Sequence, residues 1–397
     1  MNRVIETHRA GAKQPAIHIA IDLTALMHVH SGVDRYLKEL VLQLTRIDEI
    51  NRYTVFVNHG DRDLFVGQLP KNFHLTTSCL RPRPVRFAFQ QFVLPVYCAA
   101  ISADVLHSPS FLMPYVRGGQ RHLLTVHDMT FFSMPQVHNA LRRSRVFQTM
   151  VMTSIRRADM INVPSRATRD ALMEHVPDLA AEVCITEYGV SSAFYPARPE
   201  YVLRETRRLG TPDRYILYVG TIEPRKNLDV LVESYRRLIL AGDIEEHLVL
   251  AGKHDLAYPS LLKRIDTPEL RGRVHLPGFV TEADLPPLYR GARVFVYPSM
   301  AEGFGFPPLE AMACAVPVVS TLGSSLEENL GGAAELVPPQ DIDALTDALR
   351  RLLRDERLRE ARKRDGLRRA EGFRWENTVR KILNCYRELA RRGPRNN

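Results

Sequence analysis

The sequence predicts an α/β protein built from two open, largely parallel sheets. Short runs rich in β-branched residues alternate with longer segments of helical periodicity over almost the whole chain, which is the pattern of βαβ units. The alternation restarts after a proline-containing stretch at 191–213, and 397 residues are enough for two domains. We therefore expect two similar domains with a cleft between them, and ligands at the carboxyl ends of the strands.

Each half contains six segments with the composition of buried strands. The first predicted helix covers 33–47, because Tyr36, Leu40 and Leu44 fall on one helical face. The predicted strands of the first half are 17–23, 53–57, 104–107, 122–127, 160–164 and 183–187. Those of the second half are 215–220, 247–251, 274–277, 294–298, 316–320 and 334–337.

The domain boundaries follow from the breaks in this pattern. The three prolines within 191–213 indicate the interdomain linker. Residues 341–391 are expected to form terminal helices interrupted at Gly366 and Gly372. The expected divisions are a first domain at 1–196, a second domain at 197–372 and a C-terminal helix at 373–397.

The composition excludes several classes of protein. With 45% hydrophobic and 25% charged residues, the chain is neither disordered nor collagen-like nor a coiled coil. The net charge of +9 suggests phosphate-bearing partners, but the basic residues are spread over both halves, which argues against nucleic acid. Five cysteines without a Cys-x-x-Cys pair indicate neither a disulfide framework nor a zinc site, and they suit a reducing cytoplasm. No apolar signal segment precedes the first predicted strand, so we expect a cytoplasmic protein.

Common nucleotide and hydrolase motifs are missing from the sequence. No G-x-G-x-x-G follows a strand and no P-loop occurs, so dinucleotide oxidoreductases and P-loop NTPases lose their main support. H-E-x-x-H and G-x-S-x-G are also missing. Asp61 and Asp63 have the spacing of a metal–diphosphate site, but a solvated turn is the simpler interpretation, and we predict no metal site.

The strongest motif lies at 294–320, where a predicted strand leads through a glycine-rich turn into a helix. Backbone N–H groups in such a turn form an anion site, here over Gly303, Phe304, Gly305 and Phe306. Glu302 and Glu310, eight positions apart, would repel a bare phosphate and suit sugar or ribose hydroxyls. The alternative is that Glu310 merely complements the helix dipole.

A second motif, 220–227, follows the first strand of the second half. Arg225 and Lys226 are predicted to open a helix, a position where cations are unfavourable unless an anion is bound there. Together with the glycine loop they would clamp two phosphates of a leaving nucleotide. The alternative is a surface pair held by Glu223.

These motifs resemble glycosyltransferase family four, whose members are retaining enzymes with the two-domain GT-B fold. The resemblance rests on G-T-I-E-P-R-K-N at 220–227 and on E-G-F-G-F-P-P-L-E-A-M-A-C at 302–314, and it extends over nearly the whole chain. Shorter matches in the first half are S-G-V-D-R-Y at 31–36, H-S-P at 107–109, T-V-H-D at 125–128 and V-P-S at 163–165. The variant at 220–227 is most similar to bacterial polysaccharide enzymes, often mannosyltransferases that use GDP-mannose.

The resemblance implies that 1–196 binds the acceptor, that 197–372 binds the nucleotide sugar and that the helix at 373–397 packs back on the first domain. It also implies roles for individual residues. It places Glu302 and His127 at the transferred sugar, Glu310 at the ribose, and Lys226 at the diphosphate. Many members have arginine where this chain has Thr221, after Gly220, so Arg225 is expected to supply the missing phosphate contact. The resemblance also implies that backbone groups of Gly278, Phe279 and Val280 hold the base. It implies that Gly32 approaches the diphosphate from the first domain.

His127 also has a local argument for a functional role. It ends an apolar strand and precedes Asp128, which is expected to fix its tautomer. For His107, which ends another strand, a structural role is the better interpretation.

The expected reaction is transfer of a hexose, most simply mannose from GDP-mannose, to a polysaccharide or lipid-linked oligosaccharide acceptor such as that of a lipopolysaccharide or exopolysaccharide. No metal and no other cofactor is expected, because protein cations neutralise the diphosphate. A UDP- or dTDP-sugar donor is the first alternative. A nucleotide-sugar epimerase or a non-catalytic nucleotide-sugar sensor on the same fold comes second.

The sequence contains less evidence about the acceptor than about the donor. Segment 81–97 mixes arginine with phenylalanine, and arginines flank the helix predicted at 142–157, which suits an anionic membrane surface. The stretch 87–101 is shorter than the roughly 20 residues that a spanning helix needs. If either segment binds a membrane, we expect peripheral association at the inner face of the plasma membrane and a polyprenyl-diphosphate-linked acceptor. If both are ordinary solvated helix faces, a soluble acceptor is favoured.

Overall fold

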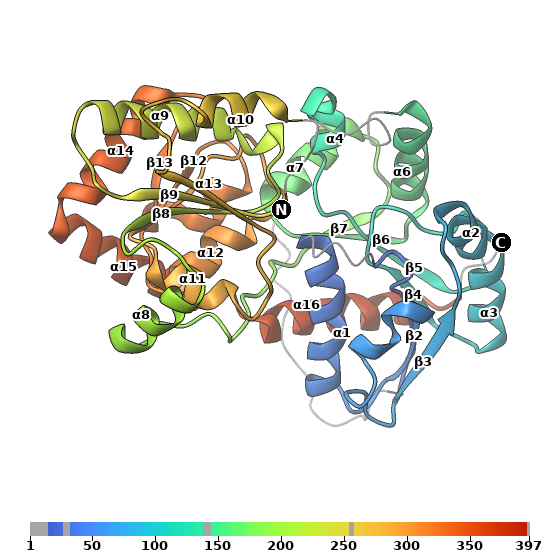
Figure 1. The fold of residues 1–397 in the computed structure, drawn as a ribbon. Helices are drawn as coiled ribbons and strands as arrows, with labels where there is room; N and C mark the ends of the chain where they lie inside the picture. Colours follow the sequence, from blue (N-terminus) through green and yellow to red (C-terminus); the bar gives the residue numbers. More distant parts are fainter. Residues whose placement is uncertain (1–14, 27–31, 117, 138–143, 254–257, 395–397) are drawn as a thin grey trace, which may run out of the picture.

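The computed structural model describes residues 15–26, 32–116, 118–137, 144–253 and 258–394. Its strands form two sheets, one in each half of the chain, and every pairing between the described strands is parallel. Figure 1 shows the two halves side by side, the first in blue to green and the second in yellow to orange. The predicted fold class, two Rossmann-like halves with parallel sheets, is confirmed.

The first sheet has seven strands in the order β3-β2-β1-β4-β5-β6-β7. They are β1 (His18–Asp22), β2 (Arg52–Asn58), β3 (Phe73–Ser78), β4 (Val105–Ser108), β5 (Arg121–Thr125), β6 (Met160–Val163) and β7 (Glu182–Ile185). The sequence pattern does not predict β3, because this edge strand is rich in polar residues and Phe73 is its one buried side chain.

The second sheet has six strands in the order β10-β9-β8-β11-β12-β13. They are β8 (Tyr215–Val219), β9 (His247–Ala251), β10 (Val274–Gly278), β11 (Val294–Tyr297), β12 (Val318–Thr321) and β13 (Glu335–Val337). Four of them, β8, β9, β11 and β12, are buried almost throughout, as expected for parallel strands covered on both faces.

Helices pack on these sheets, and Figure 1 shows α9 and α10 above the second sheet with α11 and α12 below it. The helices of the first half are α1 (Gly32–Ile47), α2 (Arg83–Ala88), α3 (Leu94–Ala100), α4 (Thr130–Ser133), α6 (Arg145–Arg157) and α7 (Arg166–His175), with the π-helical turn η2 (Phe89–Val93) between α2 and α3. Those that follow are α8 (Pro199–Arg208), α9 (Leu228–Leu240), α10 (Pro259–Ile265), α11 (Leu285–Gly291), α12 (Phe306–Ala313), α13 (Ser325–Leu330), α14 (Ile342–Arg354), α15 (Glu356–Ala370) and α16 (Trp375–Arg391). Within the described ranges, none of the helices combines the length and the hydropathy that a bilayer span requires.

The strand order reverses once in each sheet, between β1 and β4 in the first and between β8 and β11 in the second. Ligand crevices of open parallel sheets form at such reversals, outside the carboxyl ends of the strands. The two reversal points face each other: a Cβ built on Gly32, at the start of α1, would lie 3.5 Å from the ring of Phe306. Both predicted motifs therefore lie in the cleft, because they follow β8 and β11.

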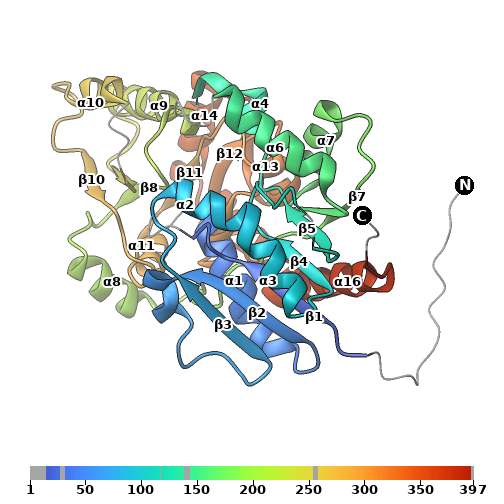
Figure 2. The same ribbon diagram turned by 90° about the vertical axis from the view of Figure 1, so that its right-hand side faces the viewer.

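The last helix, α16, returns to the first half, where it contacts α1, β4 and β5. Figures 1 and 2 show it in red against the blue helix α1 and the first sheet. Its Tyr386 hydroxyl lies 2.7 Å from Nδ1 of His107, whose Nε2 lies 2.8 Å from the hydroxyl of Thr125. Burial lowers the pKa of His107 to about 3, so the ring is a neutral hydrogen-bonding group that ties α16 to the sheet.

Two details of the predicted boundaries are wrong. Gly366 lies inside α15, where a Cβ would be 3.1 Å from Cγ of Met312, so this glycine allows close packing on α12 and does not interrupt the helix. The segment 191–213 is not a linker throughout, because Pro199–Arg208 forms α8, which packs on α11.

Candidate active site

A buried cluster of charged side chains lies where the loops after β8 and β11 meet. Lys226 Nζ contacts Oε1 of Glu302, and Arg225 Nη1 lies 3.0 Å from Oε2 of the same carboxylate. The exposed fractions of the three side chains are 13% for Arg225, 7% for Lys226 and 11% for Glu302. The structure therefore brings the three residues together and rules out the alternative of a surface pair.

The electrostatics of this cluster keep Glu302 ionised. Burial opposes ionisation of Glu302, but Arg225 and Lys226 outweigh it and lower the pKa of the carboxyl to about 2. Burial and the adjacent Arg225 lower the pKa of Lys226, against the opposing effect of Glu302. Glu223, which accepts a hydrogen bond from Arg225 at 2.9 Å, is more exposed at 25%. Arg225 and Lys226 thus share the buried carboxylate of Glu302, and Arg225 also pairs with Glu223.

Two further residues of the cluster are not predicted from the sequence. Ser299 donates to Oε1 of Glu302 at 2.6 Å, and Tyr297 donates to the same oxygen at 3.2 Å. Lys226 Nζ in turn donates to the Tyr297 hydroxyl at 2.7 Å. The signal that could have found them is their position, since Tyr297 ends β11 and Ser299 follows two residues later.

The local backbone of the second motif differs from the prediction. Pro224–Lys226 forms a 3-10 turn, and Asn227, in the left-handed conformation with φ 56°, separates it from α9. Arg225 and Lys226 therefore precede a helix and do not open it. The turn is bound to the other loop, because the Arg225 carbonyl accepts from Met300 N at 3.0 Å and its guanidinium donates to the Ala301 carbonyl at 2.8 Å.

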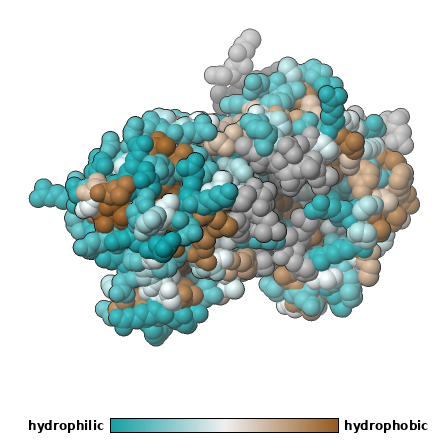
Figure 3. All heavy atoms as spheres, turned by 45° about the horizontal axis from the view of Figure 1, so that its top comes forward, coloured by the Kyte–Doolittle hydropathy of each residue, from teal (hydrophilic) through white to brown (hydrophobic). Residues whose placement is uncertain are grey.

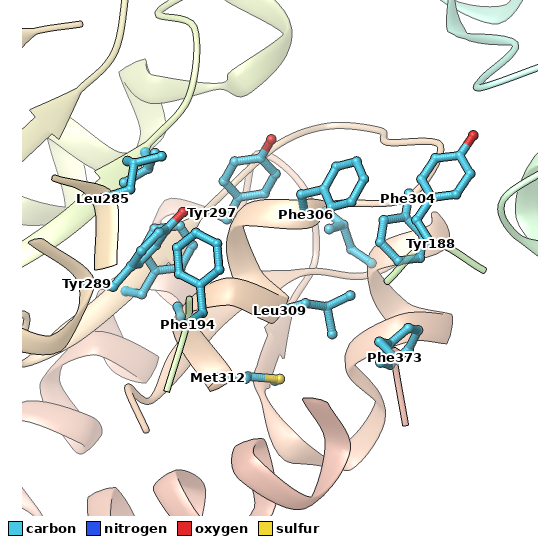
Figure 4. Packing of buried hydrophobic residues seen from close by; sticks show 14 of the residues in the cluster. Tyr188, Phe194, Leu285, Tyr289, Tyr297, Phe304, Phe306, Leu309, Met312 and Phe373 are labelled. Carbon is cyan, nitrogen blue, oxygen red and sulfur yellow. The ribbon is translucent and has the colours of Figure 1, made fainter. Parts of the chain in front are cut away.

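The glycine loop supplies backbone and not side chains to the cleft. Gly305 has φ +89°, a conformation that favours glycine, and α12 begins at Phe306 as the two following prolines predict. Figure 4 shows Phe304 and Phe306 grouped with Tyr188, and the ring centroids of Tyr188 lie 5.0 and 5.5 Å from theirs. Both phenylalanines are buried, so only the amides of this loop remain for a ligand.

Glu310 joins the two halves of the protein. This carboxylate is 2% exposed, accepts from the Tyr289 hydroxyl at 3.0 Å and forms an ion pair with Arg35 of α1. Because it pairs with the opposite half from the fifth position of α12, Glu310 does more than complement the helix dipole. Arg35 belongs to the S-G-V-D-R-Y segment, but no local pattern in the sequence indicates that it reaches Glu310.

His127 is buried, and both of its ring nitrogens are occupied. Nδ1 lies 2.7 Å from the Tyr188 hydroxyl and Nε2 lies 3.0 Å from the Pro109 carbonyl. Since a carbonyl only accepts, Nε2 carries the proton and Nδ1 accepts from Tyr188. The prediction that Asp128 fixes the tautomer is wrong, because Asp128 accepts from Thr130 through its Oδ1, and Tyr188 and Pro109 hold the ring.

The remaining predicted contacts line the carboxyl edge of the second sheet. Gly252 N donates to the carbonyl of Gly278 at 2.8 Å, and a Cβ on Gly252 would lie 1.8 Å from the carbonyl oxygen of Gly220. The loops after β8, β9 and β10 therefore touch one another, which places Gly220 and exposed Thr221 in one row with Gly278–Val280. The ring of Phe279 is 51% exposed.

The cleft is closed, with the glycine loop against the first half. A Cβ on Gly303 would lie 1.8 Å from the backbone carbonyl oxygen of His127, and Ser165 donates to the Gly303 carbonyl at 2.8 Å. Farther out, the carboxylate of Glu328 accepts from the first two amides of α7, from Arg166 and Ala167, both at 3.1 Å. Glu302 and His127, the candidates for the sugar side, therefore lie next to the contact between Gly303 and the His127 carbonyl.

One member of the acidic pair at Asp61 and Asp63 forms an ion pair with an arginine. Asp61 is buried and lies 3.3 Å from Arg81, so the interpretation as a solvated turn is wrong for this residue. Among the residues that the structure describes, no group of three or more His, Cys, Asp or Glu side chains is arranged to hold a metal ion.

Comparison with known proteins assigns the family. The family model described as "Glycosyltransferase Family 4" matches residues 30–191, and the model "Glycosyl transferases group 1" matches 213–355. The chain is 31% identical over 374 residues to O-antigen chain mannosyltransferase B of Escherichia coli, covering 90% of this chain and 96% of that protein.

Solved structures share the fold. Sucrose-phosphate synthase from Thermosynechococcus elongatus has a TM-score of 0.76 at 22% identity, over 95% of this chain and 100% of that one. HepE of Anabaena, solved in complex with UDP-glucose, has a TM-score of 0.72 at 15% identity, over 94% of this chain and 100% of that one. With a relative above 30% identity over nearly its full length and both halves matched by glycosyltransferase models, this chain belongs to glycosyltransferase family four.

Proposed function

We propose that this glycosyltransferase moves mannose from GDP-mannose to a growing surface polysaccharide or lipid-linked oligosaccharide, with retention at the anomeric carbon. The observation that carries the proposal is the buried pair Arg225 and Lys226 around one carboxylate, at the strand reversal of the second sheet. The similarity to O-antigen chain mannosyltransferase B supports mannose as the sugar and an O-antigen type of acceptor.

In the proposed reaction, the bond between the sugar and the diphosphate breaks while Arg225, Lys226 and the amides of 303–306 neutralise the departing charge. Removal of one such contact raises a barrier by about 3–4 kcal/mol in comparable oxyanion sites. Glu302 is a weak base, because its pKa is about 2 and two cations already hold it. The leaving diphosphate is therefore the group that accepts the proton of the acceptor hydroxyl, on the same face of the sugar. Product NMR that shows an inverted anomeric centre would contradict this mechanism.

The donor site continues along the carboxyl edge of the second sheet. Glu310 is proposed to accept the ribose hydroxyls, and the backbone of Gly278–Val280 to hold the base. Gly32 would approach the diphosphate from the first half, next to Phe306. His127 would meet the donor sugar from the opposite wall, although its ring nitrogens are occupied by Tyr188 and Pro109 in this structure.

A nucleotide panel tests the donor directly. Thermal unfolding of the protein with GDP, UDP, dTDP or ADP is expected to show the largest stabilisation with GDP, about 2.7 kcal/mol at 100 times the dissociation constant. A larger stabilisation by UDP or dTDP would contradict GDP-mannose and would favour transfer of glucose or rhamnose from a UDP- or dTDP-sugar. An epimerase would convert the sugar nucleotide without any acceptor, and a sensor would bind it without turnover.

We also propose that the outer face of α2, η2 and α3 rests on an anionic membrane, where a lipid-linked acceptor would be found. Phe92 is 67% and Val96 65% exposed on this helical segment, and no charged residue occurs between 87 and 101. Arg81 and Arg83 stand at its amino-terminal end, a charge that complements anionic headgroups. Figure 3 shows hydrophobic residues gathered at the right-hand edge, the side on which Figure 1 places α2 and α3.

A charge reversal on this face tests the membrane contact. The Phe92→Glu variant is expected to lose at least tenfold in binding to vesicles of phosphatidylglycerol and phosphatidylcholine, measured by flotation, because an apolar anchor is worth about 1.5–3 kcal/mol. The control is Leu240→Glu, which changes a side chain of similar exposure, 60%, at the end of α9 in the second half. Equal binding of both variants and the unmodified protein would rule out this face.

A further inference from the structure

Tyr188 lies three residues after β7, and its hydroxyl contacts the histidine that is proposed to meet the donor sugar. This hydroxyl donates to Nδ1 of His127 at 2.7 Å, which is shorter than the 3.0 Å between Nε2 and the Pro109 carbonyl. The Tyr188 side chain is 3% exposed, and burial raises the pKa of its hydroxyl well above the ordinary value of 10.0. The hydroxyl therefore keeps its proton at neutral pH and remains a donor to His127.

The ring of Tyr188 is packed between the two halves of the protein. From the first half, the centroid of the Tyr36 ring on α1 lies 4.4 Å from that of Tyr188. From the second half, the rings of Phe304 and Phe306 lie at 5.0 and 5.5 Å, and the Phe306 ring is inclined to Tyr188 by 18°. Trp375, the first residue of α16, stacks on Tyr188 at 6.3 Å with an interplanar angle of 9°. Figure 4 shows Tyr188 grouped with the two phenylalanines of the glycine loop.

The backbone beside Tyr188 is held by the start of α16. A Cβ on the next residue, Gly189, would lie 2.3 Å from the N atom of Trp375, so the chain passes directly against this helix. Val190 N donates to the Phe373 carbonyl at 2.9 Å, just before the same helix. With the backbone fixed, the position of the Tyr188 hydroxyl depends on the side-chain torsions, which the neighbouring rings restrict.

The hydrogen bond from Tyr188 selects the nitrogen of His127 that carries the proton. A neutral imidazole donates at one nitrogen and accepts at the other, and the partners of the two nitrogens decide which tautomer is present. Tyr188 supplies the proton at Nδ1, so the proton of the ring stays at Nε2. Without the hydroxyl, the ring can carry its proton at Nδ1 instead, and Nε2 then has nothing to donate.

We infer that Tyr188 is the positioning residue for His127, and that it acts while the glycine loop rests against the first half. When the halves separate, Phe304 and Phe306 leave with the second half, and the Tyr188 ring loses contacts that fix its hydroxyl. Closure of the loop thus gives His127 the tautomer in which Nε2 can donate to an oxygen of the donor sugar. The role of Tyr188 rests on the proposed function, because His127 needs a defined tautomer only if it meets that sugar.

Tyr188→Phe tests this role, because it removes the hydroxyl and keeps the ring in the stack. The kcat for transfer from GDP-mannose to octyl α-D-mannopyranoside is expected to fall by a factor of about 10 or more, since His127 is no longer held in one tautomer. The KM for GDP-mannose is expected to stay within a factor of about 2, because Arg225 and Lys226 are unchanged. The unfolding temperature is expected to fall by no more than about 4 °C, because one buried hydrogen bond is lost.

A spectroscopic readout follows the tautomer directly. In ¹⁵N spectra of protein labelled at histidine, the ring nitrogens that carry a proton differ from those that do not, and the absence of one signal in His127→Gln assigns His127. The unmodified protein is expected to show Nε2–H alone, and Tyr188→Phe a mixture of both tautomers. Absence of transfer by the unmodified protein would count against the proposed function, and the spectra would still decide whether Tyr188 sets the tautomer.

The matched control is Tyr36→Phe, which removes a hydroxyl from another ring of the same stack. Tyr36 is 0% exposed, and its hydroxyl accepts from Asn162 Nδ2 at 3.3 Å and lies 3.5 Å from the Thr125 hydroxyl. This variant is expected to keep the single tautomer of His127 and a kcat within a factor of about 2 of the unmodified protein. An equal fall in kcat in Tyr36→Phe, or an unchanged single tautomer in Tyr188→Phe, would overturn the role of Tyr188.

Phe306→Leu tests the dependence on the glycine loop. The variant removes the ring that stacks on Tyr188 and leaves both hydrogen bonds of His127 in place. The spectra are expected to show the second tautomer of His127 in a smaller fraction than in Tyr188→Phe, together with a reduced kcat. A single tautomer and an unchanged kcat in Phe306→Leu would overturn the link between loop closure and His127.

Discussion

Replacing Glu302 by glutamine is expected to abolish most of the turnover and yet to strengthen the binding of the nucleoside diphosphate. The amide no longer neutralises Arg225 and Lys226, so both cations become free to hold the phosphates. The contact to the transferred sugar is lost at the same time, and the turnover rate is expected to fall by a factor of about 100 or more. Initial rates with GDP-mannose and calorimetry with GDP measure the two effects separately.

The same variant should be less stable when no nucleotide is present. Two buried cations that lose their carboxylate cost about 3–5 kcal/mol. At the same GDP concentration the variant should gain more stability than the unmodified protein, because it is expected to bind GDP more tightly. The pKa of Glu302 in the folded protein, about 2, lies below its ordinary value of 4.5. Its ion pairs therefore contribute their full stability above pH 4.5 and lose it as the pH falls towards 2. The difference between variant and unmodified protein should shrink over that range in urea titrations.

Glu246→Gln is the matched control for this prediction. Glu246, 2% exposed, likewise lies between two basic side chains, Arg214 at 2.6 Å and Arg293 at 3.1 Å. It precedes β9, so it lies at the opposite end of the strands from the cleft loops. This variant should lose stability without rescue by GDP beyond that of the unmodified protein and without loss of turnover. A Glu302→Gln enzyme with unmodified turnover would remove Glu302 from the site.

The parts of the site that could be predicted from the sequence are those that are contiguous in it. The glycine loop with Glu302 and the pair Arg225 and Lys226 each stand directly after a buried strand, where chemistry is expected in a parallel sheet. Runs of β-branched residues likewise predict most of the strands. The edge strand β3 is not predicted, because most of its side chains are polar.

The contacts that could not be predicted join residues far apart in the chain. Ser165 and Gly303 are 138 positions apart, and Arg35 meets Glu310 only because α1 and α12 face each other across the cleft. The partners of His127 show the same limit: the neighbouring Asp128 is the obvious candidate, but Tyr188, 61 positions away, occupies the ring nitrogen. Such contacts depend on how the two halves close, which local patterns do not encode.

Closure itself depends on a glycine. A Cβ at position 303 would lie 1.8 Å from the carbonyl oxygen of His127 and 2.9 Å from Cβ of Asp128, and real Cβ contacts essentially never fall below 3.0 Å. His127 belongs to the first half and Gly303 to the second, so the clash arises only when the cleft is closed. In Gly303→Ala we expect the catalytic efficiency of transfer to fall by a factor of about 100 or more, because the halves no longer exclude water and align the sugar.

The stability of Gly303→Ala should change by less than about 1 kcal/mol, since the open form relieves the clash, and GDP binding should weaken far less than turnover. Gly332→Ala provides the control, because a Cβ there meets no atom within 4 Å and the backbone needs no left-handed conformation. Kinetics and thermal unfolding of the two variants separate closure from folding. Normal transfer by Gly303→Ala would mean that catalysis does not need the contact between His127 and Gly303. It would also contradict the proposed role of His127 at the donor sugar.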